Sequence, residues 1–353
     1  MSLAQHLAQR IAGTGPLSVA DFMAEALLHP RYGYYTTRDP LGQAGDFTTA
    51  PEISQMFGEL LGLCLAVAWQ AQGSPAPFVL AELGPGRGTL MADALRATRR
   101  VPGFHAAMQL VLVEMSPVLQ ARQNALLQAY APRHLRSVAE VPQAPLFLLA
   151  NEFFDALPIR QFQRTGQAWA ERLVGLGADG QLCMGLGAEA AQPALAARLA
   201  DTSPGDVVET CPAAGPIAAE IGQRIAQHGG AALIVDYGDW RSLGDTLQAL
   251  QGHGPVDVLA SPGQADITAH VDFEALATAA PCAHTRLTPQ GAFLQRLGID
   301  HRAKALAENL QDAALASHWA AHRRLTHAEE MGTLFKVLGL YPAQMPPPPG
   351  FLP

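Results

Sequence analysis

The stretch Phe78-Val-Leu-Ala-Glu-Leu-Gly-Pro-Gly-Arg-Gly88 decides the fold. Its first half is a short, nearly continuous apolar run, which is typical of a strand buried on both faces of a parallel sheet. Its second half places glycines at 84, 86 and 88, and the residues over 88–100 predict a helix. A strand, a glycine-rich turn and a helix in this order let backbone amides approach a polar ligand closely. The stretch therefore predicts an α/β fold with a ligand site at the turn.

Three further apolar runs predict neighbouring strands of the same sheet. They are Gln109–Glu114, Pro145–Asn151 and Ala231–Asp236. Helical stretches over 117–130 and 213–228 lie between them, and this alternation predicts a doubly wound sheet. Ligands of such a sheet bind beyond the carboxyl ends of its strands. We therefore expect the polar residues that end the four strands to lie at one edge, namely Glu82, Glu114, Asn151 and Asp236.

The rest of the chain predicts additions to this sheet. Residues 1–75 read as an N-terminal helical and lid region, in which Ser18 caps a helix from Val19 to Leu28 and residues 31–51 form a shaped loop. Residues 76–353 form the core, with an inserted hairpin or subdomain at about 157–212 and further substrate-side elements at about 240–300. The run Pro346–Pro349 predicts an extended tail.

Composition narrows the classes of function. The chain has 353 residues, 49% of them hydrophobic, which is enough for a large core. Only 15% are charged and the net charge is −8, so we expect no nucleic-acid partner. The four cysteines lie far apart without a metal-binding spacing, so we expect no metal. The N-terminus lacks the pattern of a secretory signal and the longest apolar stretch is too short to span a bilayer, which predicts a cytoplasmic protein without membrane insertion.

The turn itself favours one kind of cofactor. A dinucleotide fingerprint needs glycine at 89, where this chain has Thr89, and Glu82 would repel a pyrophosphate. A carboxylate there suits a cofactor that carries an ammonium and a sulfonium, such as S-adenosylmethionine. Glu114 ends the second strand and can accept both hydroxyl hydrogens of a ribose. A purely structural glycine turn and a helix-capping or salt-bridged Glu114 are the plainer alternatives.

A second cluster follows the third strand, at Asn151-Glu-Phe-Phe-Asp-Ala-Leu-Pro158. It sets an amide, two carboxylates and two aromatic rings at the sheet edge, where an acceptor substrate must meet the methyl group. Such a set invites a cationic guest, because a guanidinium can lie between aromatic faces and donate in a fork to a carboxylate. We expect Asn151, Glu152 and Asp155 to be the catalytic residues, although Asp155 could simply cap a helix.

These segments resemble the MidA family, whose members are bacterial and mitochondrial protein-arginine methyltransferases linked in eukaryotes to assembly of respiratory complex I. The resemblance extends over nearly the whole chain. Its segments are 32–35, 45–55, 57–59, 82–90, 113–117, 151–158, 236–238, 265–273 and 331–338.

The resemblance implies a class I methyltransferase fold with S-adenosyl-L-methionine as donor, and, for the mitochondrial relatives, symmetric dimethylation of an arginine in the large subunit of complex I. For this chain it implies a protein substrate, with a complex I subunit among the candidates. It also implies a cytoplasmic location in bacteria and a mitochondrial one for the eukaryotic relatives. Departures at 248–253 and 288–291 bear on substrate identity. The cofactor residues that it implies, with Asp46 and Phe47 covering the ligand, are Asp46, Phe47, Glu82, Gly84, Gly86, Gly88, Glu114 and Asn151.

Two other functions compete with this interpretation. One is a dinucleotide-dependent oxidoreductase, against which Glu82 and Thr89 both count. The other is a non-catalytic assembly factor that keeps the cofactor fold, against which the convergent acids count. The sequence leaves the oligomeric state and the methyl acceptor open.

Overall fold

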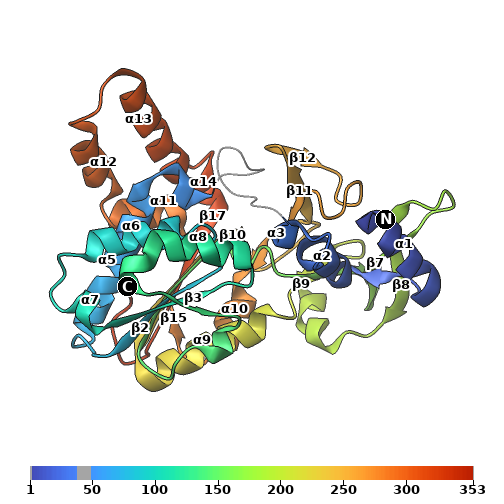
Figure 1. Ribbon diagram of the computed structural model, residues 1–353. Helices are drawn as coiled ribbons and strands as arrows, with labels where there is room; N and C mark the ends of the chain where they lie inside the picture. Colours follow the sequence, from blue (N-terminus) through green and yellow to red (C-terminus); the bar gives the residue numbers. More distant parts are fainter. Residues whose placement is uncertain (1, 38–48, 353) are drawn as a thin grey trace. The chain divides into compact units, whose positions relative to one another are not determined.

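The computed structural model describes residues 2–37 and 49–352 (Figure 1). The chain divides into two compact units, each assembled from separate segments. Unit 1 takes Met1–Phe47, Asp155–Ala214 and Arg241–Asp272, and unit 2 takes Thr48–Phe154, Gly215–Trp240 and Phe273–Pro353. The sequence predicts a boundary at residue 75, whereas these units are assembled from segments that end elsewhere. The predicted division into domains stays a prediction.

Unit 2 contains the sheet that the apolar runs predict. The four predicted strands are β2 (Phe78–Leu83), β3 (Met108–Val113), β5 (Leu146–Asn151) and β10 (Gly230–Asp239). The other strands of this sheet are β4 (Arg133–Leu135), β15 (Ala283–His284), β16 (Thr288–Pro289) and β17 (Phe335–Tyr341). The strands run in the order β15-β17-β10-β5-β2-β3-β4, with β4, β3, β2, β5 and β10 parallel to one another. The partners of β17 are antiparallel to it. The predicted α/β sheet is therefore confirmed, with an antiparallel addition at one side.

Helices cover both faces of this sheet. Longer ones are α5 (Gln55–Ala71), α6 (Thr89–Thr98), α8 (Pro117–Leu127), α9 (Ala214–His228), α12 (Ile299–Ala307) and α13 (Asp312–Thr326). Shorter ones are α4 (Ala50–Ile53), α7 (Phe104–Ala107), α10 (Phe273–Ala279), α11 (Gln290–Arg296) and α14 (Met331–Leu334). Figure 1 draws α5 and α6 on one side of the strands and α9 and α10 on the other. Buried side chains of α5 such as Leu61 and Leu65 share one core cluster with Leu80, Phe147 and Leu233 of the strands.

The C-terminal end of the chain corrects one expectation. The Phe351 ring lies 4.8 Å from that of Phe293 between centroids, and Phe351 packs against the main core of unit 2. The Pro349 carbonyl also accepts a hydrogen bond from the Cys64 thiol at 3.3 Å. The proline run is therefore not a free tail, because the aromatic residue just beyond it packs against a buried partner, and the extended backbone of the run stays a prediction.

Unit 1 combines N-terminal helices with small sheets. Its helices are α1 (Leu3–Thr14), α2 (Val19–Leu28) and α3 (Tyr34–Thr37). Its strands are β1 (Leu17–Ser18), β6 (Arg160–Thr165), β7 (Ala168–Leu176), β8 (Leu182–Ala190), β9 (Val207–Thr210), β11 (Gln248–Gln251), β12 (Gly254–Val256), β13 (Asp266–Thr268) and β14 (Val271–Asp272). One sheet has the order β1-β7-β6-β9 with β8 beside β7, and the other has the order β12-β11-β13.

Local signals near the N-terminus are partly confirmed. Ser18 caps α2, and its hydroxyl accepts a hydrogen bond from the Asp21 backbone N–H at 3.0 Å. The segment predicted as a loop contains two single-turn helices, α3 and α4, at the ends that the structure describes. In the described part of the chain, no helix combines the length and apolar character that crossing a membrane requires.

Candidate active site

The predicted site lies where the strand order of the unit 2 sheet reverses. β2 pairs with β3 on one side and with β5 on the other, all three parallel. The chain leaves β2 and β5 at the same edge and continues in opposite directions across the sheet, which opens a crevice for ligands. Glu82 and the glycine turn come from β2, Glu114 from β3, and Asn151 with Glu152 from β5. The sheet therefore gathers these predicted residues at one edge.

The glycine turn has the backbone conformation that its sequence requires. Gly84, Gly86 and Gly88 have φ values of +58°, +53° and +86°, which side chains rarely tolerate. Gly88 is the N-cap of α6, and no side chain caps the helix there. The first backbone N–H groups of α6 are thus available to a polar ligand. A Cβ on Gly84 would lie 2.9 Å from Cδ2 of Phe153, so the turn also packs closely against the segment after β5.

Glu82 is a buried carboxyl group with an unsatisfied oxygen. It is 3% exposed, and among the described residues its Oε2 has no hydrogen-bond partner. Burial, and secondarily the charge of Glu114, raises the pKa of Glu82 to about 8. A buried acceptor without a donor costs free energy unless a ligand supplies one. Glu82 is therefore suited to an ammonium or hydroxyl donor from a bound molecule.

Glu114 is oriented by its neighbours, and one of them escaped the sequence analysis. Its Oε1 accepts from the Ser116 backbone N–H at 2.8 Å and its Oε2 from Gln123 Nε2 at 3.3 Å. Gln123, fully buried on α8, also donates to the Gly86 carbonyl at 2.7 Å and lies 2.8 Å from His134 Nε2. Burial raises the pKa of Glu114, and the hydrogen bonds from Ser116 and Gln123 oppose this. Gln123 thus ties the glycine turn to the ribose carboxylate that we predict.

Asn151 and Glu152 form a connected pair after β5. Asn151 Nδ2 donates to Glu152 Oε1 at 3.0 Å, and the Ala50 backbone N–H donates to the same oxygen at 3.1 Å. Glu152 has φ +50°, an uncommon value for a residue with a side chain and one that often marks functional sites. Asn151 Oδ1 is buried and has no hydrogen-bond partner among the described residues. The pair therefore offers one fixed carboxylate and one unsatisfied amide oxygen.

Asp236 proves to be a backbone-holding residue. It is fully buried inside β10, which continues to Asp239 and so does not end at Asp236 as predicted, and its Oδ2 accepts from the Phe154 N–H at 3.0 Å. Its Oδ1 accepts from the Tyr237 N–H, also at 3.0 Å. These bonds fix the turn that carries Glu152, so Asp236 supports the site from behind.

Asp155 belongs to unit 1, where it meets two other segments of the resemblance. Its backbone carbonyl accepts from the Ala269 N–H at 3.0 Å, and Tyr35 Oη donates to Asp266 Oδ1 at 2.6 Å. Burial raises the pKa of Tyr35 well above its usual range, and the charges of Asp266 and Asp155 add to this effect. The catalytic role predicted for Asp155 stays a prediction. Asp46 and Phe47 lie outside the described residues.

Potential metal ligands also approach one another in unit 1. The ligand atoms of His6, Glu25 and His29 lie within 4.8 Å of one another. Arg10 Nη1 donates to Glu25 Oε1 at 2.8 Å, and His29 Nδ1 accepts from the Arg31 N–H at 3.0 Å. The protein itself therefore engages two of the three side chains.

The sheet edge fits S-adenosyl-L-methionine in three respects. Two buried oxygens, Glu82 Oε2 and Asn151 Oδ1, lack donors among the described residues and match the cofactor's ammonium and hydroxyl groups. The uncapped start of α6 suits a carboxylate. Glu114 has a fixed orientation and, with about four acceptor positions on its two oxygens, capacity for further hydroxyl donors.

Comparison with known proteins agrees with this chemistry. The model of a family described as "Putative S-adenosyl-L-methionine-dependent methyltransferase" matches residues 60–292. Mitochondrial proteins named protein arginine methyltransferase NDUFAF7 are similar over most of the chain. The protein from Bos taurus is 40% identical over 96% of this chain and 83% of its own length, and that from Homo sapiens is 39% identical over 96% and 83%.

Solved structures lead to the same family. A Burkholderia thailandensis protein crystallised with S-adenosyl-homocysteine superposes with a TM-score of 0.82 and 29% identity, covering 97% of this chain and 92% of that one. A native crystal structure from the same organism gives 0.77 and 30%, covering 97% and 91%. The predicted fold, cofactor and enzyme class are thereby confirmed, and the oxidoreductase and scaffold alternatives are not. The chain belongs to the MidA-like family of S-adenosyl-L-methionine-dependent methyltransferases.

Proposed function

We propose that this methyltransferase modifies an arginine of a protein substrate, and that Glu152 receives the guanidinium. The observation that carries the proposal is the fixed carboxylate of Glu152 at the edge of β5, held at Oε1 by the Ala50 N–H and the Asn151 amide. It lies one residue beyond the strand, at the reversal point of the sheet where a ligand is expected.

The chemistry of the acceptor requires such a group. A guanidinium is protonated at neutral pH and donates through a rigid fork, which a carboxylate matches. S-adenosyl-L-methionine supplies an electrophilic methyl group and leaves as a neutral thioether. When the new N–C bond forms, the guanidinium must lose one proton, and the Glu152 carboxylate can accept it. Glu152 therefore both orients the acceptor nitrogen and receives the displaced proton.

Other predicted residues take supporting roles in this proposal. Asn151 orients Glu152 through its amide and offers Oδ1 to the cofactor. Asp155 follows Glu152 by three residues and adds negative charge for a cationic acceptor. Asp46 and Phe47, which lie outside the described residues, stay predicted cofactor residues on the strength of the resemblance.

The substrate and its location extend the proposal. The relatives from Bos taurus and Homo sapiens are named mitochondrial protein arginine methyltransferases. We propose a protein acceptor for this chain, a complex I subunit among the candidates, and a cytoplasmic location in a bacterial cell. Mass spectrometry of arginine methylation in cells with and without the gene identifies the acceptor.

The direct test is Glu152→Gln. The amide keeps the size and an acceptor oxygen for Ala50 but loses the charge, so methyl transfer is expected to fall by about 10²-fold or more, the scale of a lost acid–base group. Affinity for S-adenosyl-L-methionine, measured by calorimetry, is expected to persist.

Glu140→Gln is a matched control, because Glu140 is an exposed glutamate of the same unit. It is expected to leave both transfer and affinity unchanged. Full transfer to the true substrate by Glu152→Gln would place the guanidinium site elsewhere. Asp155 would then be the next residue to test, together with His270 of the segment 265–273 on which the resemblance rests, since Asp236 accepts from backbone N–H groups.

A further inference from the structure

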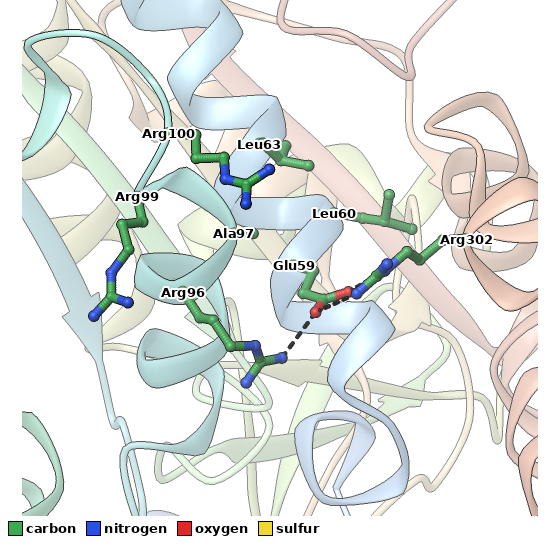
Figure 2. Close-up of a pocket in the computed structure, with 8 residues that line it drawn as sticks. All are labelled: Glu59, Leu60, Leu63, Arg96, Ala97, Arg99, Arg100 and Arg302. Carbon is green, nitrogen blue, oxygen red and sulfur yellow. Dashed lines mark hydrogen bonds and ion pairs between the residues drawn. The ribbon is translucent and has the colours of Figure 1, made fainter. Parts of the chain in front are cut away.

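A second candidate binding site lies on the outer side of unit 2, where α5 and α6 meet α12. A depression of about 590 Å³ lies there, and Figure 2 draws the side chains that line it. Its lining combines four guanidinium groups with apolar side chains and a single acid. The lining residues are Glu59, Leu60, Leu63, Arg96, Ala97, Arg99, Arg100 and Arg302.

The acid at its base anchors two of the arginines. Glu59 is 4% exposed, and its Oε1 accepts from Arg96 Nη2 at 2.8 Å and from Arg302 Nη2 at 2.9 Å (Figure 2). Its Oε2 accepts from Arg302 Nε at 2.6 Å. Arg96 also donates to Asp93 Oδ1 at 2.5 Å. Four charge-assisted hydrogen bonds therefore hold these guanidiniums at fixed positions.

The two helices below, α5 and α6, approach each other closely. A Cβ on Gly58 would lie 2.7 Å from the Asp93 Cβ, and one on Gly62 would lie 2.6 Å from the Ala94 Cα. Close approach of α5 and α6 thus depends on these two glycines. Phe57-Gly-Glu59 is one of the segments on which the family resemblance rests, yet the active site makes no use of Glu59. A rigid platform is what a preorganised binding surface requires.

The remaining arginines are not neutralised. Arg99 and Arg100 are exposed, and no ion pair joins either of them to an acid in the described ranges 2–37 and 49–352. Four arginines face two acids, Glu59 and Asp93, which leaves a local charge of about +2 on a chain of net charge −8. The dipole at the C-terminus of α6 favours cations near Arg99. It does not explain why the four arginines surround a depression.

The rest of the lining selects the kind of anion. Leu63 is 38% exposed and, with Leu60 and Ala97, gives the depression an apolar floor. None of the lining residues is aromatic, so a nucleotide base has nothing to stack on. The helix end at Arg99 is a C-terminus, whose carbonyls do not attract a phosphate as an N-terminus does. A ligand whose carboxylates flank an apolar side chain matches both features. Its apolar part fits the floor, and its carboxylates accept hydrogen bonds from the guanidinium groups that have no ion pair within the described residues.

We propose that this depression binds an acidic peptide segment of a partner protein, with an apolar side chain on Leu60 and Leu63 and carboxylates on Arg99 and Arg100. At 1.5 Å per helical residue, Arg99 lies about 16 Å along α6 from the glycine turn at Gly88. The segment thus binds away from the cofactor, and the proposal is independent of which residue accepts the methyl group.

The experiment measures fluorescence anisotropy with the full chain and a labelled peptide in which acidic residues flank a leucine. The acidic peptide is expected to bind, and binding is expected to weaken as NaCl rises. A peptide with lysines at the acidic positions is expected not to bind. The double variant Arg99→Glu/Arg100→Glu is expected to weaken binding by about tenfold or more, since two attractive contacts become repulsive.

Two controls keep the result interpretable. Arg133→Glu/Arg286→Glu changes the net charge equally at exposed arginines elsewhere in unit 2, and it is expected to retain binding. Leu63→Ser leaves the charge unchanged and is expected to weaken binding through the floor alone. S-adenosyl-L-methionine affinity and the thermal melting curve report whether each variant is folded.

Three outcomes would overturn the proposal. The first is equal binding by the parent and by a folded Arg99→Glu/Arg100→Glu variant. The second is an equal loss in the control double variant, which would show general charge attraction only. The third is displacement of the peptide by inorganic phosphate or ATP at lower concentrations than by unlabelled peptide, which would make the depression a phosphate site.

Discussion

Two buried glutamates of unit 2 have opposite electrostatic surroundings. Glu82 and Glu59 are 3% and 4% exposed. Burial raises the pKa of Glu82 to about 8, and among the described residues its Oε2 receives no hydrogen bond. Burial also acts to raise the pKa of Glu59, but hydrogen bonds from Arg302 and Arg96 outweigh it and lower the pKa. With similar exposed fractions, one carboxyl group is therefore protonatable, while the other is kept as an anion by its two arginines.

The difference separates a group that awaits a ligand from one that completes the fold. Glu59 has its cations within the chain, so its charge serves the arrangement of α5, α6 and α12. Glu82 carries a cost of desolvation that no described residue offsets. A protein retains such a group where a bound molecule supplies the missing partner.

The largest expected effect comes from Gly84→Val, which disrupts the turn next to Glu82 and so tests whether that end of the sheet binds the cofactor. A branched side chain at φ +58° is strained, and its Cβ would meet the Phe153 ring at 2.9 Å. S-adenosyl-L-methionine affinity, measured by calorimetry, is expected to fall by about 10²-fold or more. Gly73→Val is the control, because Gly73 has φ +81° but open space around it. Tight cofactor binding by a folded Gly84→Val protein would show that the turn does not contact the cofactor.

Glu114→Ala is expected to weaken cofactor binding by roughly 1.5–3 kcal/mol, the usual range for hydrogen bonds to a charged group. Glu114→Asp is expected to fall between the two. Gln123→Leu removes the donor that orients Glu114 and ties down the Gly86 carbonyl, and a smaller loss should follow. If Glu114→Ala binds the cofactor like the parent, this carboxylate does not contact the ribose.

The reciprocal pair Glu59→Gln and Glu82→Gln tests the comparison directly. Glu59→Gln removes the anion shared by two half-exposed guanidiniums, of which, among the described residues, only Arg96 keeps a second acid, Asp93, and is expected to lower the free energy of unfolding by about 1–2 kcal/mol, with cofactor affinity unchanged. Glu82→Gln is expected to leave the free energy of unfolding unchanged and to weaken cofactor binding by a similar free energy. Denaturant titration and calorimetry measure the two effects. The comparison would be refuted by both variants losing the same property.

The smallest expected signal is a proton released on cofactor binding. Because the folded pKa of Glu82 is about 8 against an ordinary 4.5, its contribution to stability is fully present below pH 4.5 and is lost as pH rises through 8. A cationic ligand that favours the ionised carboxylate therefore displaces up to one proton near pH 7. Calorimetry in buffers of different ionisation enthalpy measures it, and Glu82→Gln is expected to abolish it. For Glu59 the sign reverses, since a lowered pKa gives stability that is present above pH 4.5 and lost as pH falls through the folded value.

The sheet and the acids at the ends of its strands are readable from sequence, because local patterns determine them. The run Phe78–Leu83 and its three counterparts are buried on both faces, so apolar residues without alternation mark them as strands. Where such strands end, a polar residue must meet solvent or a ligand, which is how Glu82, Glu114 and Asn151 could be found. The MidA resemblance added the cofactor and the activity.

Other features depend on contacts between distant segments and could not be predicted. Gln123 is an ordinary helical residue by sequence, and its role arises only because Gly86, Glu114 and His134 surround it. The same holds for the bond between Tyr35 and Asp266, which are 231 positions apart. The strands of residues 157–212 carry many Gly and Ala residues, which weakens the alternation on which a strand prediction relies.

The threading of unit 1 has a consequence for biosynthesis. Its N-terminal helices bury Leu3, Leu7 and Phe22 in one cluster with Ile159 and Ile267. A ribosome adds about 5–20 residues per second. The last segment of unit 1, which ends at residue 272, is therefore completed roughly 10–50 s after residues 1–47. During that interval the apolar faces of α1 and α2 lack their native partners, while the first strands of unit 2 have already been made. Chaperone capture of nascent chains should therefore be strongest before residue 272 leaves the exit tunnel, and chains truncated near residue 240 should aggregate through these two helices.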